Sequence, residues 1–170
     1  LLFDPGELER LELLRPMLEA MKDLMDILIR KRKNRGAMEF SFPETHVDLD
    51  ELGRPVNVFP YPINEAHRII EEFMIVCNEF VAERFERMKA PFIYRIHEDP
   101  DTEKITEFLA LAKLFGAGGH LKGKPTSKFL SVLMEGIKDE PFAPALSQVL
   151  LRSLAKAVYS KDNVGHFGLS

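Results

Sequence analysis

The loop from Gly118 to Lys124 carries the pattern that most directly suggests chemistry, because it imitates the phosphate-binding sequence G-x-x-x-x-G-K. A genuine loop of this kind follows a strand and opens into a helix, with Ser or Thr after the lysine to bind magnesium. Here a helical pattern precedes the loop, and Pro125 occupies the hydroxyl position. The sequence therefore argues against the binding of a nucleoside triphosphate.

Histidine and cysteine residues form no recognisable metal or nucleophile motif. The histidines are His46, His67, His97, His120 and His166, and none of them has the spacing of a known ligand pair. We predict no metal site made by this chain alone, although convergence of distant histidines in the fold stays open. No G-x-S-x-G sequence is present. The single cysteine, Cys77, lies among apolar helix residues, which predicts a buried and unreactive thiol.

Three further features each allow a chemical and a structural interpretation. The basic run from Arg30 to Arg35 can bind phosphates, but basic residues also stabilise the C-terminal end of a helix. Phe40 can stack on a base only if its ring stays open at a cleft, whereas Phe is commonly buried. Glu71 can contact a ligand, or it can be one of several solvated acids on its helix. The patterns alone do not decide between these interpretations.

Composition describes a globular chain with a slightly acidic balance. The chain has 170 residues, 45% of them hydrophobic and 29% charged, which suits one domain or part of a larger one. Lys and Arg number 23 against 27 Asp and Glu, which argues against a wholly cationic nucleic-acid binder but allows a local basic channel. No apolar stretch reaches the roughly 20 residues of a membrane span, and no signal peptide is recognisable. The lone cysteine favours a reducing, cytoplasmic setting, and a first residue other than Met suggests a chain that begins inside a longer protein.

Apolar spacing predicts two long helices separated by a small sheet. Leu and Met residues at intervals of three and four predict a helix from Pro5 to Arg32, which Pro16 should kink or split. Alternating residues between positions 38 and 58 predict short strands, which we interpret as a small antiparallel pair. A second long helix is predicted from Asn64 to Met88.

The second long helix has three different faces when its residues are placed about 100° apart. Its apolar arc, expected to face the core, consists of Ile69, Phe73, Val76, Cys77, Phe80 and Val81. One polar line is made by Glu65, Glu72 and Glu79, and we expect it to face water. The other polar line is made by Asn64, Glu71 and Asn78, with His67 and Arg68 on either side, and we expect it to face a more specific neighbour.

Shorter elements follow the long helices. A strand from Phe92 to His97 places Arg95 and His97 on one face. Three helices are then predicted, starting at Asp101 or Thr102, spanning Ser127 to Met134, and spanning Ala143 to Tyr159. The fold class is therefore α+β and mostly helical, with long helices packed on a small antiparallel sheet. We expect one unit over residues 1–170 with no internal domain boundary.

Five segments occur in an order that resembles a known family. They are Arg35–Phe40, Asn64–Met74, Tyr94–Pro100, Leu151–Ser153 with Ala157–Tyr159, and Gly165–Leu169. Each segment is short, but together they resemble the catalytic domain of the RNase II and RNase R exoribonucleases, and more closely the RNase R branch. The resemblance covers nearly the whole chain, and the first helix is its least distinctive part.

This resemblance implies a hydrolase that degrades single-stranded RNA processively from its 3′ end and releases nucleoside 5′-monophosphates. It also implies Mg²⁺ ions held by an aspartate cluster, flanking cold-shock and S1 domains of the OB type, and a cytoplasmic enzyme that we expect to be a monomer. The aspartate cluster of the family and its trailing arginine motif have no counterpart in this chain. We therefore expect a central-to-late fragment of a catalytic domain, with an incomplete catalytic set, no metal ligands and no activity by itself.

The resemblance also assigns roles to two matched residues. Phe40 corresponds to the aromatic residue that stacks on the 3′-terminal base, and Glu71 to the acid that contacts the terminal nucleotide near its ribose. The 2′-hydroxyl distinguishes RNA from DNA, so an acceptor at this place makes chemical sense. Candidate wall residues without an assigned role are Asn64, His67, Arg95, His97 and His166. The rival hypothesis is a non-catalytic RNA-binding or structural helical module that kept the framework and lost the chemistry.

Overall fold

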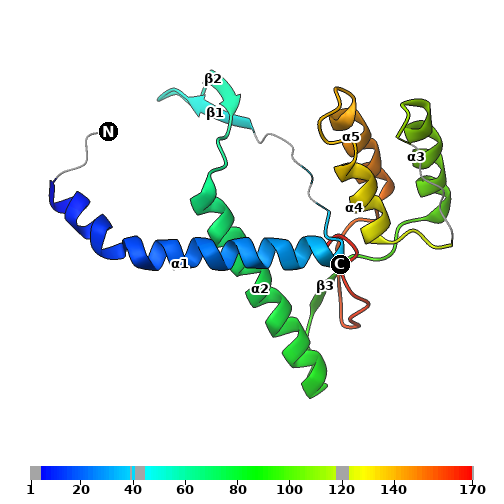
Figure 1. Ribbon diagram of the computed structural model, residues 1–170, viewed down its shortest axis with the longest axis horizontal. Helices are drawn as coiled ribbons and strands as arrows, with labels where there is room; N and C mark the ends of the chain where they lie inside the picture. Colours follow the sequence, from blue (N-terminus) through cyan, green and yellow to red (C-terminus); the bar gives the residue numbers. More distant parts are fainter. Residues whose placement is uncertain (1–4, 39, 41–44, 118–122, 170) are drawn as a thin grey trace.

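A computed structural model describes residues 5–38, 40, 45–117 and 123–169 of the chain, and Figure 1 shows their arrangement. The elements within these residues are α1 (Pro5–Arg35), β1 (Thr45–Leu49), β2 (Pro55–Pro60), α2 (Glu65–Met88), β3 (Tyr94–Ile96), α3 (Thr102–Leu114), α4 (Ser127–Glu135), α5 (Ala143–Ser153) and β4 (Val158–Ser160). The mostly helical α+β class with a small antiparallel sheet is thereby confirmed. None of the helices described is long and apolar enough to cross a membrane.

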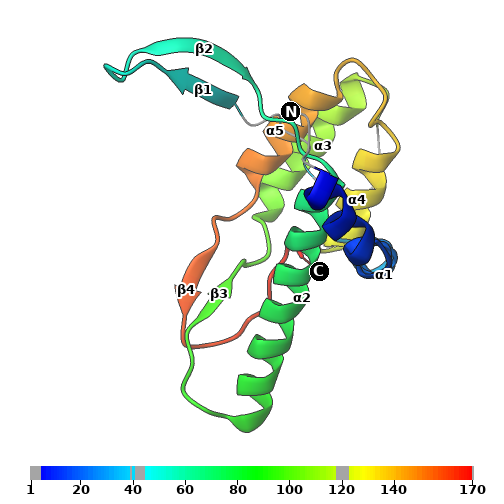
Figure 2. The same cartoon turned by 90° about the vertical axis from the view of Figure 1, so that its left-hand side faces the viewer.

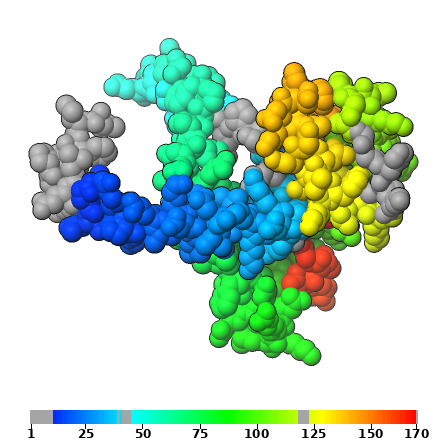
Figure 3. Space-filling model, viewed as in Figure 1, coloured from blue at the N-terminus to red at the C-terminus, as the bar shows by residue number. Residues whose placement is uncertain are grey.

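The two long helices cross each other, as Figure 1 shows. Helix α1 continues through Pro16 as one helix and ends three residues later than predicted. Helix α2 has the predicted bounds to within one residue, because Asn64 caps its first turn and Lys89, with a φ of 51°, ends its last turn in the left-handed region. Figure 3 shows α1 as a ridge that runs along this face to the block formed by the later helices.

That block, made by α3, α4 and α5, contains most of the buried core. Its fully buried side chains are Ile105, Phe108, Leu130, Leu146 and Leu150. Ile105 and Phe108 of α3 and Leu146 and Leu150 of α5 are spaced at helical intervals, and Leu130 of α4 joins them in one core cluster. The predicted starts of α3 and α4 are confirmed, with Asp101 and Thr126 as their side-chain N-caps.

The two β-ribbons lie outside this block. Strands β1 and β2 form the expected antiparallel hairpin, in which Val47 lies opposite Val58, and Figure 2 shows that it projects away from the helices. Strand β3 pairs with β4, so that Tyr94 lies opposite Ser160 and Ile96 opposite Val158. The region predicted as strand from residue 38 onward is irregular at Met38 and Phe40, and residues 39 and 41–44 lie outside the described part.

The prediction of a last helix that reaches Tyr159 is wrong. Helix α5 ends at Ser153, and Leu154 is buried in an extended conformation with a ψ of 151°. The chain then runs back along β3, and Val158 to Ser160 form strand β4, which pairs antiparallel with β3. Leu146, Leu150 and Leu154, which are spaced four residues apart, are all buried, but Val158, four residues further on, belongs to the strand.

The prediction that the apolar arc of α2 faces a core is wrong for most of its residues. Ile69 is buried, but Phe80 is 61% exposed and Val81 is 40% exposed in the described structure. Cys77 is also exposed, which contradicts the prediction of a buried thiol. The reason is that α2 packs on α1 through the neighbouring line of Glu65, Glu72 and Glu79 instead.

Gly36 joins the end of α1 to the helical block. Its φ of +109° is in the region that favours glycine, and a Cβ atom there would lie 2.5 Å from the Cα of Lys128 at the start of α4. The Ser131 hydroxyl of α4 also donates to the carbonyl oxygen of Ala37, at 3.4 Å. The segment after α1 is therefore pressed against α4 just before it reaches Phe40.

Candidate functional site

Phe40 lies at the edge of an open hollow between the end of α1 and helices α4 and α5. It is partly buried and packs against the core of the helical block. The hollow has a volume of about 620 Å³ and is lined, besides Phe40, by Met38, Ser131, Met134, Pro144 and Ser147, among others. A ring that touches the core on one side and lines a hollow on the other is suited to contact a planar ligand.

The rim of this hollow is charged. Lys33, Glu135 and Lys138 contribute to its lining. The ammonium group of Lys138 donates to the Glu135 carboxylate at 2.6 Å, and this hydrogen bond lowers the pKa of Glu135. The carboxylate is therefore ionised at neutral pH and partly balances the lysines, so the rim is a mixed rather than a purely basic surface.

Glu71 lies on a different part of the structure. It is exposed on α2, as is Asn78 seven residues later, so this side of the helix is open in the described residues. Asn64, the third member of the predicted line, is the N-cap of α2. Its side-chain oxygen accepts from the His67 N–H at 3.2 Å, while its own N–H donates to His67 Nδ1 at 3.2 Å. Asn64 and His67 therefore hold the start of the helix in a reciprocal capping arrangement.

The line of Glu65, Glu72 and Glu79 faces α1, so the prediction that it faces water is wrong. Glu72 is 3% exposed and accepts from Arg32 at 2.5 Å. Glu79 accepts two hydrogen bonds from Arg35, at 2.6 and 3.2 Å. Glu65 pairs with Lys22 at 2.9 Å near the other end of the crossing. The spacing of seven residues places these three acids on the side of α2 that faces basic residues of α1. The sequence pattern alone does not distinguish such a side from one that faces water.

Arg95, His97 and His166 form the third group of predicted site residues. Arg95, in β3, and His97, the residue after β3, alternate with the buried residues Tyr94 and Ile96, and the predicted strand of Phe92 to His97 is shorter in the structure. His97 forms a β-bridge with His166, and their rings meet edge to face with centroids 5.0 Å apart. Among the described residues, His97 Nε2 and His166 Nδ1 are buried without a hydrogen-bond partner.

Acidification should destabilise the protein through His166. Burial, followed by the nearby His97 and Arg95, lowers the pKa of His166 below its usual 6.5. The unfolded chain then binds a proton at higher pH than the folded chain, so stability falls as the pH drops from about 6.5 through the lower pKa of the folded state. We expect an NMR titration to show this lowered pKa, and a His166→Asn variant to lose part of the acid sensitivity. A His166 pKa at or above 6.5 would contradict the expectation.

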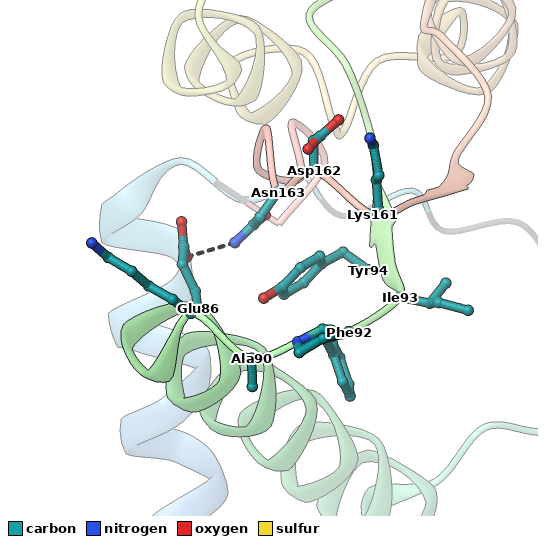
Figure 4. A pocket seen from close by; sticks show the side chains of 10 residues that line it. Glu86, Ala90, Phe92, Ile93, Tyr94, Lys161, Asp162 and Asn163 are labelled. Atoms are coloured by element: carbon teal, nitrogen blue, oxygen red, sulfur yellow. Dashed lines mark hydrogen bonds between the residues drawn. The ribbon is translucent and has the colours of Figure 1, made fainter.

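A second hollow lies at the C-terminal end of α2, beside β3 and the turn after β4 (Figure 4). Its volume is about 840 Å³, and the ring of Tyr94 lies across it in Figure 4. The side-chain amide of Asn163 donates to the Glu86 carboxylate at 2.7 Å, which ties this turn to the end of α2. None of the site residues predicted from the sequence lines this hollow.

The acids and histidines described by the structure do not form a metal site. No group of three or more His, Cys, Asp or Glu among residues 5–38, 40, 45–117 and 123–169 is placed to hold an ion. The residues present therefore do not fit the Mg²⁺ centre that the resemblance implies, and no chemical step of this chain is assigned to a metal.

Comparison with known proteins decides the family. The RNB domain family matches residues 4–170. The chain belongs to the RNB domain family. It is 40% identical to ribonuclease R of Aquifex aeolicus over 153 residues. The aligned region covers 90% of this chain and 22% of that protein. The RNB chain thus spans about a fifth of the length of this relative.

Solved structures agree with the fold. Mycoplasma genitalium RNase R in complex with ribose-methylated single-stranded RNA superposes on the RNB chain with a TM-score of 0.84 and 28% identity, over 89% of this chain and 24% of that one. Yeast Ssd1, described as a pseudonuclease, superposes with a TM-score of 0.63 at 19% identity, over 89% of this chain and 19% of that one, which shows a shared fold alone.

Proposed function

We propose that this RNB chain is part of a longer RNase R-like exoribonuclease, called the full-length protein below. It would remove nucleotides processively from the 3′ end of single-stranded RNA and release nucleoside 5′-monophosphates. The observation that carries the proposal is the 40% identity to a ribonuclease R over 90% of the chain. The structural likeness to an RNase R in complex with single-stranded RNA supports it.

The proposal requires components beyond the described residues. Mg²⁺ ions would be held by an aspartate cluster elsewhere in the full-length protein, because the described acids do not converge on a site. Cold-shock and S1 domains would supply positively charged grooves and stacking surfaces that lead RNA to the catalytic domain. We propose a cytoplasmic monomer, and roles for Phe40 at the terminal base and Glu71 at the terminal ribose.

The rival, a non-catalytic module, has some support from the fold. A pseudonuclease shares it with a TM-score of 0.63, so the fold by itself does not guarantee catalysis. We favour the enzyme because the identity to ribonuclease R is 40%, whereas the identity to the pseudonuclease is 19%.

Degradation of a labelled RNA tests this proposal. The full-length protein with Mg²⁺ should shorten a 5′-labelled single-stranded RNA from its 3′ end and release nucleoside monophosphates. EDTA should stop the reaction, and the chain of residues 1–170 alone should release none. A full-length protein that binds RNA without shortening it would support the non-catalytic module instead.

Phe40→Ala should weaken the hold of the full-length protein on the RNA end. Stacking of a base on an aromatic ring contributes about 1–3 kcal/mol, which corresponds to roughly a five- to 150-fold loss of affinity. Because Phe40 also touches the core, Phe40→Leu is the matched variant that keeps apolar volume but removes the ring. Both variants should raise the Kd for single-stranded RNA in a fluorescence titration. Wild-type affinity for Phe40→Leu would make Phe40 a core residue only.

A further inference from the structure

A chain of hydrogen bonds connects His97 to the segment that carries Phe40. His97 follows β3, and its Nδ1 atom accepts from the backbone N–H of Gly168 at 3.3 Å. The carbonyl oxygen of Gly168 in turn accepts from the backbone N–H of Met38, also at 3.3 Å. Met38 is 8% exposed and lies two residues before Phe40. Segments that are far apart in the sequence therefore meet at one glycine.

The residues before Gly168 in this turn are also bonded to the backbone of His97. The N–H of His97 donates to the Gly165 carbonyl oxygen at 3.1 Å, and the N–H of Phe167 donates to the His97 carbonyl oxygen at 2.8 Å. Phe167 is buried in the same core cluster as Met38. The N–H of Leu169 also donates to the His166 carbonyl oxygen at 3.0 Å. The backbone of the turn is therefore held before and after Gly168, and the His97 side chain supplies the contact to the N–H of Gly168.

The contact between His97 and Gly168 depends on one ring nitrogen. Because Nδ1 accepts the Gly168 N–H, the neutral ring carries its proton on Nε2. The approach to Gly168 is also tight, since a Cβ atom there would lie 3.2 Å from His97 Nδ1 and 3.5 Å from His166 Cε1. The imidazole of His97 therefore acts as both an acceptor and a spacer for Gly168.

We propose that His97 is a positioning residue for the base-stacking site, acting on Phe40 through Gly168 and Met38. The proposal rests on the proposed function of Phe40. Without the Nδ1 acceptor, the N–H of Gly168 loses its partner. The turn that presents the Gly168 carbonyl oxygen to Met38 is then held by fewer contacts, and the ring of Phe40 is held less firmly at the hollow between α1, α4 and α5. His166, packed edge to face on His97, supports the imidazole.

Paired variants of the full-length protein test the proposal. His97→Leu removes the acceptor, whereas His97→Asn keeps an oxygen bonded to Cγ, where Nδ1 is bonded in histidine. A typical neutral hydrogen bond is worth about 0.5–1.5 kcal/mol, so His97→Leu should raise the Kd for single-stranded RNA about 2- to 12-fold. His97→Asn should stay within about twofold of wild type. Gly168→Ala, whose Cβ atom would lie 3.2 Å from Nδ1, crowds the same contact without changing His97 and should also raise the Kd.

An RNA whose 3′-terminal nucleotide lacks its base separates positioning from general structural damage. On this substrate the wild type loses stacking, so His97→Leu should add no further loss. For the same reason, His97→Leu should have no additional effect in a Phe40→Ala background, since coupled residues are not additive. A full His97→Leu effect on the abasic RNA, or equal effects of the Leu and Asn variants, overturns the proposal.

The outcomes also distinguish this inference from the function on which it rests. If Phe40→Ala weakens RNA binding and His97→Leu does not, the positioning role fails and the stacking role stands. If Phe40→Ala leaves RNA binding unchanged, the stacking role fails and the positioning role fails with it.

Discussion

Glu72→Gln should cause the largest loss of stability of any single change in the contact between the two long helices. The Glu72 side chain is 4% exposed and the Arg32 side chain 11% exposed, with 2.5 Å between their charged atoms. Breaking a buried ion pair by neutralising one partner typically costs about 3–5 kcal/mol, because a charge remains in a site that water hardly reaches. We expect an unfolding transition of the full-length protein several degrees below that of the wild type, measured by scanning calorimetry.

The two other acids of the same line provide graded controls. Glu79 is 28% exposed and Glu65 is 67% exposed, so the effect of each Gln substitution should decrease in that order from Glu72. Exposed pairs are weakened by solvent screening, so Glu65→Gln should be close to wild type.

A double replacement separates the cost of neutralising one partner from the value of the pair. Arg32→Met with Glu72→Leu removes both charges and fills the site with apolar groups. Such replacements are often neutral or stabilising, so the double variant should be more stable than Glu72→Gln. A Glu72→Gln protein as stable as wild type, or a double variant worse than Glu72→Gln, would contradict the assignment of a buried pair.

Local signals in the sequence predicted most of the elements. Asn64, Asp101 and Thr126 each cap a helix whose start was predicted or nearly so, because capping depends on residues only a few positions away. The end of α5 was mispredicted because Val158 continues the apolar spacing of the helix. Its strand conformation depends on pairing with Ile96, a residue far away in the chain.

Predictions about the faces of α2 were less successful for a related reason. A helical wheel shows that Glu72 shares a line with Glu65 and Glu79. A line of acidic residues is compatible both with exposure to water and with ion pairs to basic residues of a neighbouring helix. The arrangement of Lys22, Arg32 and Arg35 on α1 decides between them, and it becomes visible only when the two helices cross. The basic residues at the end of α1 offered the one available signal, and helix-end electrostatics explained them equally well.

Glu71→Gln should impair RNA turnover by the full-length protein while leaving its stability nearly unchanged. Glu71 is exposed on α2, about 100° around the helix from the buried Glu72, so its charge is not needed for the packing of α1. A hydrogen bond that involves a charged group is worth about 1.5–3 kcal/mol, which corresponds to roughly a 10- to 150-fold loss in kcat/KM. The defect should shrink on an RNA whose last sugar lacks the 2′-hydroxyl, because that substrate has already lost the contact.

The control for Glu71 must be an exposed acid elsewhere on α2, because Glu72 belongs to the packing between the helices. Glu83 meets this requirement: its side chain is 62% exposed, and it pairs with Arg87 one turn later at 2.9 Å. It lies 12 residues after Glu71 on the same helix, which turns it about 120° away from the proposed ribose contact. Glu83→Gln should therefore retain wild-type turnover on both ribose- and deoxyribose-ended RNA. Equal losses from the Glu71 and Glu83 variants, or a Glu71 defect that is the same for both terminal sugars, would mean that this side of α2 does not contact the terminal ribose.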